Sequence, residues 1–514
     1  MESFKDSSEN LSESSILDSS VQLAERFCNN NYKNKRKPIG QFFTPPDVAN
    51  YMANQIKLPK QDFSLLDPGA GTGILLAAVC DRIYNEYKKP INLTIVAYEN
   101  NFEIIPNLEE TLSYCRTKLF EKGHIVNYTV IKKDFIDINS RYLLKKPKKD
   151  LPYYDIVISN PPYYKLNKDS KESKLMSEFV YGQPNIYSFF VIVSTKMLKE
   201  NGQFIYITPR SFCSGLYYKK MRKWLLDNSC ITKIHSFNSR KNIFEMDNIL
   251  QEVLIIAGEA TNKKKCKSVH ISLSSDRTFS DLYDLSVPYS LINPGKNKES
   301  YIRIPMNEKD LNLIKKIDSW NNVLKDFNIN ISTGKVVDFR TKGNLVNNYD
   351  QEGSVPLIWM QNLDINKVNL DIQNFEKPRG ILHNNETVNI TIPVKNYILM
   401  KRFTTKNDKR RLFAVPFPKK DFRDFRYIGF ENHLNYIYKI EGELSLNEMY
   451  GLSALFNSKI MDSYFRTISG STQVNATDIR KMPLPDYDKI ISLGNYSRRN
   501  KKLDYSDYIQ KILK

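Results

Sequence analysis

The chain has 514 residues, of which 76 are Lys or Arg and 57 are Asp or Glu, so its formal net charge is +19. This length predicts two to four domains, and the positive excess favours a polyanionic partner, nucleic acid, over an ordinary solvated surface. No apolar run approaches a membrane span, the N-terminus lacks a signal peptide's apolar core, and the six cysteines form no C-x-x-C pair. We therefore expect no membrane span, no disulfide framework and no zinc site, and a reducing cytoplasm fits this pattern.

The N-terminal region is polar before the first apolar elements. Residues 1–31 are rich in Ser, Glu and Asn, which predicts a flexible tail with at most one small helix. After a basic linker, Thr44-Pro45-Pro46-Asp47 predicts the start of a helix, because Thr44 can cap the first turn and proline fits there. An ordinary capped helix explains this segment as well as a functional role does.

A glycine-rich turn follows the first predicted strand. Residues 63–73 read FSLLDPGAGTG, an apolar strand that ends at Asp67 and then carries glycines two residues apart. The glycines allow a tight turn and let a ligand approach the backbone closely. A dinucleotide-binding fingerprint requires glycine at position 74, where this chain has Ile74 at the start of a helix predicted over 74–87.

Acidic residues also end the next two predicted strands, 91–98 and 126–132. Glu99 follows the first and is a candidate acceptor for ribose hydroxyls, while Asp134 follows the second and is a candidate acceptor for an adenine amino group, with Phe135 packing on the ring. Each acid alone is a common strand-end residue. Together with Asp67 they suit a cationic cofactor that carries ribose and adenine, and they suit a pyrophosphate poorly.

A rigid loop follows the fourth predicted strand, residues 154–158. It reads Ser159-Asn160-Pro161-Pro162-Tyr163, and two consecutive prolines cannot continue a sheet or open a regular helix. The Asn160 side-chain oxygen and the Pro161 carbonyl can accept hydrogen bonds from an exocyclic amine, and Tyr163 can stack on a base. The plain alternative is a turn after a strand.

Three later apolar runs complete a doubly wound α/β sheet of seven strands, which we place at residues 203–208, 231–237 and 249–257 after a helix over 186–198. A lysine-rich shift in composition then marks a boundary before a mixed α/β domain. In that domain one long helix is predicted over 446–466, opened by the capping box of Ser445 and Glu448. The expected parts are a tail (1–31), a catalytic domain (32–262), a linker (263–300), a recognition domain (301–490) and a basic tail (491–514).

In the C-terminal half, basic residues alternate with aromatic ones. Arg and Lys next to aromatic residues can bind phosphate and read guanine edges. An ordinary charged surface residue explains each of these positions equally well. The candidates for DNA contact are Lys335, Arg340, Lys401, Arg402, Lys409, Arg410 and Arg411.

The glycine turn behind Asp67 and the later Asn160-Pro161-Pro162-Tyr163 together resemble the S-adenosylmethionine-dependent adenine-N6 DNA methyltransferases of the gamma class, over about residues 38–258. The resemblance implies a C-terminal target-recognition domain that includes segments 431–436 and 470–479, with Gln473 and Asn475 as DNA contacts. It also implies that Phe244 forms a second aromatic wall around an extruded base, although a plain core role for Phe244 stays open. The implied cofactor-binding set is Thr44, Pro45, Asp67, Gly69, Ala70, Gly71, Gly73, Glu99, Asp134, Phe135 and Asn160.

We therefore expect an enzyme that transfers a methyl group to N6 of an adenine flipped out of duplex DNA, without a metal, in a prokaryotic cytoplasm near the nucleoid. It acts alone or beside a cognate restriction endonuclease, and its oligomeric state is left open. Three alternatives remain. They are a protein glutamine-N5 methyltransferase, which shares only the catalytic half; a fused methyltransferase and nuclease; and a non-catalytic DNA-binding specificity protein.

Overall fold

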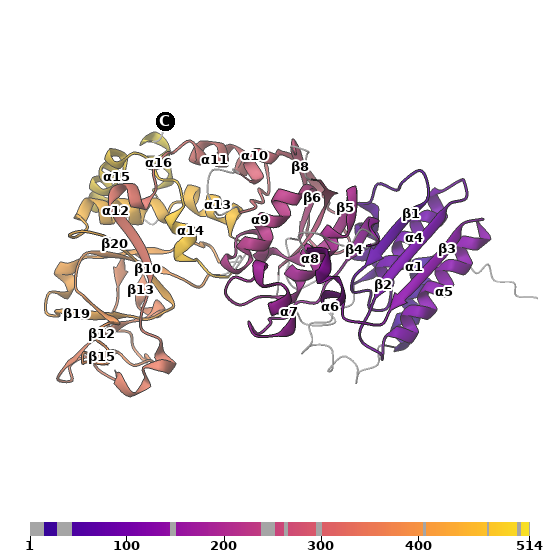
Figure 1. The fold of residues 1–514 in the computed structure, drawn as a ribbon. Coiled ribbons are helices and arrows are strands. Elements are labelled where there is room, and N and C mark those ends of the chain that lie inside the picture. Colours follow the sequence, from indigo (N-terminus) through magenta and orange to yellow (C-terminus); the bar gives the residue numbers. More distant parts are fainter. Residues whose placement is uncertain are drawn as a thin grey trace, which may run out of the picture. The chain divides into compact units, whose positions relative to one another are not determined.

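The computed structural model describes residues 15–27, 44–143, 151–237, 252–261, 266–293, 301–404, 408–469, 472–500 and 505–512. The chain divides into two compact units, Met1–Ile304 and Pro305–Lys514 (Figure 1). The second unit therefore begins within a few residues of the predicted recognition domain, whereas the first unit extends through the predicted linker.

The first unit is built on a nine-stranded sheet with the order β3-β2-β1-β4-β5-β7-β6-β8-β9. Strands β3, β2, β1, β4 and β5 are parallel neighbours, and β7 runs antiparallel to both β5 and β6. The strands are β1 (Phe63–Asp67), β2 (Asn92–Tyr98), β3 (Ile125–Ile131), β4 (Tyr154–Ser159), β5 (Leu198–Pro209), β6 (Ser229–Phe237), β7 (Val253–Ala260), β8 (Ser268–Ser274) and β9 (Tyr283–Pro288).

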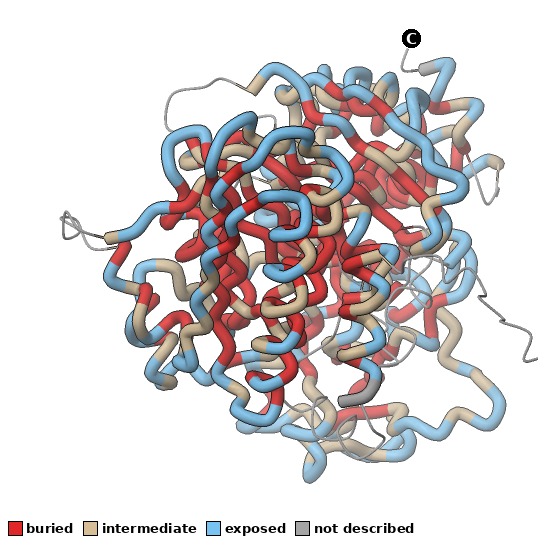
Figure 2. Tube along the Cα trace, turned by 90° about the vertical axis from the view of Figure 1, so that its right-hand side faces the viewer, coloured by how far each residue is buried: buried red, intermediate tan, exposed pale blue. Residues whose placement is uncertain are grey.

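Helices cover both faces of this sheet, as continuous apolar strands require. In β1, Leu65 belongs to the core that includes α4, whereas its neighbour Leu66 points to the other face and is equally buried. Figure 2 shows the buried residues along the inner segments of the trace and the exposed ones along the outer turns. The helices are α1 (Ile16–Phe27), α3 (Pro46–Asn54), α4 (Ile74–Glu86), α5 (Ile105–Glu121), α6 (Phe135–Asn139), α7 (Lys171–Leu175), α8 (Ile186–Lys196), α9 (Lys219–Asn228) and α10 (Tyr289–Ile292).

The structure corrects the sequence-based boundaries at both ends of this unit. Part of the predicted flexible tail forms α1, which is held by a hydrogen bond from the Ile16 amide to Asp81 Oδ1 (2.8 Å) and by one from Asn107 Nδ2 to the Leu23 carbonyl (3.0 Å). The predicted linker supplies β8 and β9, so the sheet has nine strands where seven were expected. The Lys-rich composition before β8 obscured its alternating apolar residues.

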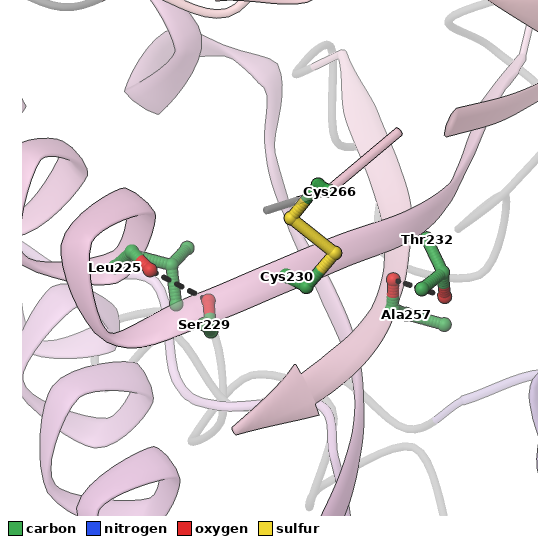
Figure 3. The surroundings of a disulfide bond; sticks show 6 residues. All are labelled: Leu225, Ser229, Cys230, Thr232, Ala257 and Cys266. Atoms are coloured by element: carbon green, nitrogen blue, oxygen red, sulfur yellow. Dashed lines mark hydrogen bonds between the residues drawn. A yellow bond between two sulfur atoms is a disulfide. The ribbon is translucent and has the colours of Figure 1, made fainter. Parts of the chain in front are cut away.

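A disulfide joins Cys230 of β6 to Cys266, which lies just before β8 (Figure 3). The sequence predicted no disulfide framework, and this bond corrects that prediction for Cys230 and Cys266. Strands β6 and β8 are parallel neighbours, so their pairing brings residues 36 apart in sequence to a Cα–Cα distance of 5.7 Å. Spacing along the chain cannot reveal such a contact. Cys80, Cys115 and Cys213 are buried and free.

The second unit contains three small sheets, with strand orders β10-β20-β17-β18, β11-β15-β12-β19-β16 and β13-β14. Its strands are β10 (Ile329–Thr333), β11 (Leu345–Val346), β12 (Ser354–Ile358), β13 (Leu363–Asp364), β14 (Lys367–Val368), β15 (Gly380–Leu382), β16 (Thr391–Pro393), β17 (Tyr397–Lys401), β18 (Ala414–Phe417), β19 (Tyr427–Phe430) and β20 (Leu434–Lys439). The core between the sheets combines aliphatic and aromatic side chains, with Phe417 stacked on Phe422 at 3.9 Å between ring centroids.

The helices of the second unit are α11 (Glu308–Asp318), α12 (Leu446–Phe456), α13 (Lys459–Ile468), α14 (Ala476–Arg480), α15 (Tyr487–Arg499) and α16 (Ser506–Ile512). The capping box of Ser445 and Glu448 is confirmed at the start of α12. The single long helix expected after it is wrong, because Ser458 caps a new helix, α13, through a bond from the Met461 amide. Most of the predicted basic tail is also ordered, since it forms the end of α15 and all of α16.

Helices α12 and α15 cross at two glycines. A side chain at Gly451 would meet the carbonyl of Ile490, and one at Gly494 would meet the backbone of Asn447. Two helices can approach this closely only where neither carries a Cβ atom at the crossing. The contact also explains why α15 is part of the unit rather than a tail.

We expect Gly494→Ala to lower the free energy of unfolding of the second unit by about 1–3 kcal/mol, although alanine is the better helix former. The added methyl group must push α15 away from α12. Chemical denaturation followed by circular dichroism measures the change. Gly343→Ala is the control, because nothing lies within 4 Å of its added methyl group. Equal stability of the Gly494→Ala variant and the wild type would contradict the close crossing.

Candidate active site

A cavity of the first unit lies at the carboxyl ends of β1, β2, β3 and β4. Strand order reverses between β1 and β4, and open α/β sheets bind ligands at this point. The cavity has a volume of about 370 Å³. Its walls come from the turn after β1, the ends of β2 and β3, the loop after β4 and one residue of α8. They comprise Thr44, Pro68, Gly69, Ala70, Gly71, Thr72, Ile74, Leu75, Tyr98, Glu99, Asn100, Asn101, Lys133, Asp134, Phe135, Asn160, Pro162, Tyr164 and Phe190.

The glycine turn is held open by its neighbours. The Ala70 amide donates to the Tyr98 carbonyl at 2.9 Å, and the Gly71 amide donates to Glu99 Oε2 at 3.0 Å. Gly73 has a φ of 87°, and a side chain there would press on Leu108 and Thr111 of α5. The turn therefore needs glycine at position 73 for its backbone conformation and for the packing of α4 against α5.

Glu99 holds together two sides of the cavity. Besides the Gly71 amide, its carboxylate accepts hydrogen bonds from the amides of Asn100 (3.0 Å) and Asn101 (2.9 Å). The side chain is buried, and this burial raises the pKa of Glu99, while the three amide donors act in the opposite direction. A contact to ribose hydroxyls, as predicted from the sequence, would add to this structural role.

Asp67 ends β1 just before the glycine turn, but its side chain does not line the cavity. It is completely buried, Oδ1 accepts from the Gly69 amide at 3.1 Å, and Oδ2 makes no hydrogen bond to any described residue. Burial raises the pKa of Asp67 to about 7, which the Gly69 amide opposes and the charge of Glu99 reinforces. Of the three strand-end acids, Glu99 and Asp134 line the cavity, and this acidic lining fits a cationic cofactor.

Asp134 and Phe135 lie where α6 begins. Asp134 Oδ1 caps that helix by accepting from the Asp137 amide at 2.8 Å, and Asn100 Nδ2 lies 3.5 Å from Oδ2. The buried Phe135 ring packs edge-on against Tyr98 and tilted against Phe190, with centroids 5.1 and 5.0 Å away. Both residues line the cavity, as the sequence predicted, and their contacts with adenine remain proposals.

Asn160 lies at the end of β4 and links the cavity to the helix before it. Its Nδ2 donates to Thr44 Oγ1 at 3.1 Å, and its Oδ1 accepts from the Tyr163 hydroxyl at 2.7 Å. The prediction that Thr44 caps the following helix is wrong, because Pro45 occupies the cap position of α3 and no side chain bonds to that turn. Instead, Thr44 bonds to the amide of the rigid loop.

Nine of the nineteen residues that line the cavity were predicted from the sequence, and ten were missed. Asn100 and Asn101 directly follow Glu99, so their position after a strand end was the available signal. Tyr164 follows the rigid loop, and Phe190 projects from α8 on the far side of the sheet, which no local pattern indicates. Among the predicted site residues, the cavity lining does not include Pro45, Asp67, Gly73, Pro161 or Tyr163, and Phe244 lies outside the described residues.

In the second unit, four segments that are far apart in sequence meet in one place. We call this cluster, residues 334–340, 401–404, 431–435 and 472–475, the junction. The Arg402 amide donates to the His433 carbonyl (3.0 Å) and the Val474 amide to the Arg402 carbonyl (2.7 Å), while Asn435 Nδ2 donates to the Val474 carbonyl (2.7 Å). The junction therefore gathers six of the candidate DNA contacts, namely Lys335, Arg340, Lys401, Arg402, Gln473 and Asn475.

Within the junction, Lys335 and Arg340 are exposed, and Arg340 lies over the exposed Phe339 ring, 5.5 Å from its centroid. His433 is held between the Phe403 ring, 4.8 Å away, and the buried Glu431, whose Oε1 lies 2.7 Å from His433 Nδ1. Burial raises the pKa of the Glu431 carboxyl, and the hydrogen bond from the His433 amide opposes this shift. The hydrogen-bonded backbone of the junction thus holds charged and aromatic side chains close together.

Lys401 of the junction and the three predicted DNA contacts outside it, Lys409, Arg410 and Arg411, differ in exposure. Lys409 is exposed on a turn, Arg410 is half-buried and donates to the Asn457 carbonyl, and Lys401 is half-buried over the Phe413 ring. Arg411 is only 3% exposed, and its guanidinium donates to Thr404 Oγ1 and Ser469 Oγ. A DNA contact is therefore wrong for Arg411, which stabilises the interior instead.

Two further findings concern the described ranges alone. No cluster of three or more His, Cys, Asp or Glu side chains there is placed to hold a metal ion. No helix within those ranges is long and apolar enough to cross a membrane.

The nine-stranded sheet, with its antiparallel β7 and its acidic crevice at the β1–β4 switch point, defines a Rossmann-like methyltransferase. A family model described as Eco57I restriction-modification methylase matches residues 50–244. The type II methyltransferase M.PstI of Providencia stuartii is 34% identical over 92% of this chain and 91% of its own length. The type II methyltransferase M.BsuBI of Bacillus subtilis is 34% identical over 91% of each chain. The chain belongs to the type II restriction–modification DNA methyltransferases.

Two solved structures share the fold over most of the chain. The DrdV–DNA complex matches with a TM-score of 0.50 and 13% identity, covering 93% of this chain and 59% of that one. A nuclease-deletion mutant of the type ISP restriction-modification enzyme LlaGI in complex with a DNA substrate mimic also has a TM-score of 0.50, with 11% identity and coverage of 89% and 46%. At these identities, the likeness shows the fold alone.

Proposed function

We propose that this protein transfers the methyl group of S-adenosylmethionine to N6 of an adenine that is flipped out of duplex DNA. The observation that carries the proposal is the position of Asn160 and Pro162 in the wall of the same cavity as the glycine turn, Glu99 and Asp134. An amine acceptor and a site for a cationic cofactor thus share one crevice.

When bound, S-adenosylmethionine supplies a sulfonium-activated methyl group. Asp67 and Glu99 provide negative charge for its cationic and ribose parts, and Asp134 and Phe135 provide the surroundings for its adenine. The adenine amine is a poor nucleophile because its lone pair is delocalised into the ring. Asn160 Oδ1 and the Pro161 carbonyl accept its hydrogens and favour a pyramidal nitrogen, so the chain contributes placement rather than a strong base.

The choice of adenine over cytosine rests on residue type. C5 methylation of cytosine needs a nucleophilic cysteine after a proline, and no cysteine in this sequence follows a proline. N4-cytosine enzymes of this kind more often carry serine where this chain has Asn160. The base must leave the helix at a cost of a few kcal/mol, and Tyr163, with Phe244, is proposed to repay part of that cost by stacking.

We further propose that the exposed groups of the junction contact the DNA, and that a cognate endonuclease recognises the same site in a prokaryotic cytoplasm. The proposed chemistry uses neither Cys230 nor Cys266, the two residues that the disulfide joins.

Single-molecule sequencing of DNA from cells that express the protein tests the proposal. We expect N6-methyladenine at one position of a fixed short sequence, and we expect Asn160→Ala cells to lack it. Methylation of cytosine at N4, or no new mark, would contradict the proposal. The method also identifies the recognised sequence.

The role of the junction has its own test. We expect Lys335→Ala and Arg340→Ala each to weaken DNA binding and to reduce the slope of log affinity against log salt by about one, because each removes one phosphate contact. Fluorescence anisotropy at several salt concentrations measures both quantities. Lys309→Ala, an exposed lysine of α11 outside the junction, is the control. An unchanged slope in both junction variants would place the DNA elsewhere.

A further inference from the structure

The Tyr163 hydroxyl contacts more than its expected stacking role requires. It lies 2.7 Å from Asn160 Oδ1 and 2.8 Å from the carbonyl oxygen of Ile207. Ile207 belongs to β5, where it pairs with Ile255 of β7, so its carbonyl is fixed by the sheet. The hydroxyl therefore connects the catalytic amide to the neighbouring strand.

The two contacts compete for one hydrogen. A phenol carries a single donor hydrogen, while a backbone carbonyl and an amide oxygen are both acceptors. The Tyr163 hydrogen is therefore shared between Asn160 Oδ1 and the Ile207 carbonyl, and a small rotation about the C–O bond moves it from one to the other. Neither position requires the ring to move.

The other end of the Asn160 amide is also held, because Nδ2 donates to Thr44 Oγ1 at 3.1 Å. A planar amide that donates at one end and accepts at the other has a fixed orientation in its pocket. The oxygen has two acceptor positions, so an incoming amine and the Tyr163 hydroxyl can both bond to it.

We propose that the Tyr163 hydroxyl is a positioning group that orients Asn160 Oδ1 for the target amine and keeps its hydrogen bond to that oxygen while the amine is bound, with the Ile207 carbonyl fixing the hydroxyl in place. This inference rests on the proposed adenine methylation and adds a second role to that of the ring. No proton leaves the tyrosine. Burial raises the pKa of Tyr163 well above its usual value, so the hydroxyl stays a donor throughout the pH range of activity.

The test separates the hydroxyl from the ring. Tyr163→Phe keeps the stacking surface of the ring. It removes the hydroxyl and with it the hydrogen bonds to Asn160 Oδ1 and to the Ile207 carbonyl. With saturating DNA and S-adenosylmethionine, we expect its single-turnover rate of methyl transfer to fall about tenfold, as loss of one hydrogen bond in the transition state would give. Base flipping, measured by fluorescence of 2-aminopurine at the target position, and cofactor affinity should equal those of the wild type.

Tyr187→Phe is the matched control. Its ring packs edge-on against Tyr163 with centroids 6.0 Å apart, so it removes a buried hydroxyl from the same neighbourhood but not the one on Asn160. We expect its rate to stay within about twofold of the wild type.

A wild-type rate in Tyr163→Phe would overturn the positioning role and leave stacking alone. A reduced rate that is accompanied by an equal loss of the 2-aminopurine signal would also overturn it, because the hydroxyl would then act on base binding. Failure of the proposed function looks different, since in that case the wild type itself leaves adenine unmodified.

Discussion

Replacement of Asn160 by alanine is expected to lower the rate of methyl transfer about a thousandfold, because it removes a preorganised acceptor that acts on the reacting amine. Cofactor affinity should change little, since Asp67, Glu99 and Asp134 remain in place. Quenched single-turnover reactions with radiolabelled S-adenosylmethionine measure the rate, and calorimetry measures the affinity.

Asn100→Ala is the matched control for Asn160. It removes the same side chain from the same cavity, but from the end of β2 rather than β4. We expect weaker cofactor binding and a maximal rate within about threefold of the wild type at saturation. A rate for Asn160→Ala above about a tenth of the wild-type rate would rule out its acceptor role.

Cofactor affinity is expected to rise about tenfold from pH 6 to pH 8. The pKa of Asp67 in the free protein is raised to about 7 by burial, so at pH 6 the carboxyl is mostly protonated. A cation beside it favours the charged form, and binding at low pH must therefore release a proton at a cost in free energy. If the carboxyl stays ionised in the complex at pH 6, affinity follows the ionised fraction of Asp67 in the free protein. That fraction rises from about a tenth at pH 6 to about nine tenths at pH 8, which gives the factor of about ten.

Calorimetry in buffers of different ionisation enthalpy detects the released proton directly. Asp67→Asn should bind more weakly at pH 8 and should lose the pH dependence. Asp62→Asn is the control, because Asp62 is exposed just before β1. An affinity of the wild type that is equal at pH 6 and pH 8 would mean that no cationic group of the cofactor lies near Asp67.

The fold of the first unit can be predicted from local sequence more fully than the fold of the second unit. The strands ending at Asp67, Tyr98, Ile131 and Ser159 were each located within one or two residues, because buried parallel strands are short apolar runs. Parallel pairing then brings their carboxyl ends together, so the acids and Asn160 could be placed in one crevice from the order of elements. Wall residues that come from other elements, such as Phe190 of α8, could not be placed in this way.

Two predictions were wrong for physical reasons, the linker in place of β8 and the DNA contact of Arg411. Val269, Ile271 and Leu273 of β8 alternate with polar residues and are buried, a strand pattern that the preceding lysines outweighed in the prediction of a linker. Arg411 lies beside two basic residues, so its charge suggested DNA. Its burial depends on Thr404 and Ser469, which come from distant segments and leave no trace in the local sequence.

The central claim is that the amide and carbonyl of the loop after β4 hold an adenine amine beside the cofactor. Digestion of duplex DNA to nucleosides after incubation with the purified protein and methyl-labelled S-adenosylmethionine, followed by mass spectrometry, tests it most directly. We expect the label in the deoxynucleoside of N6-methyladenine and in no other nucleoside. Label in N4-methylcytosine, or in protein glutamine while the DNA stays unlabelled, would contradict the claim.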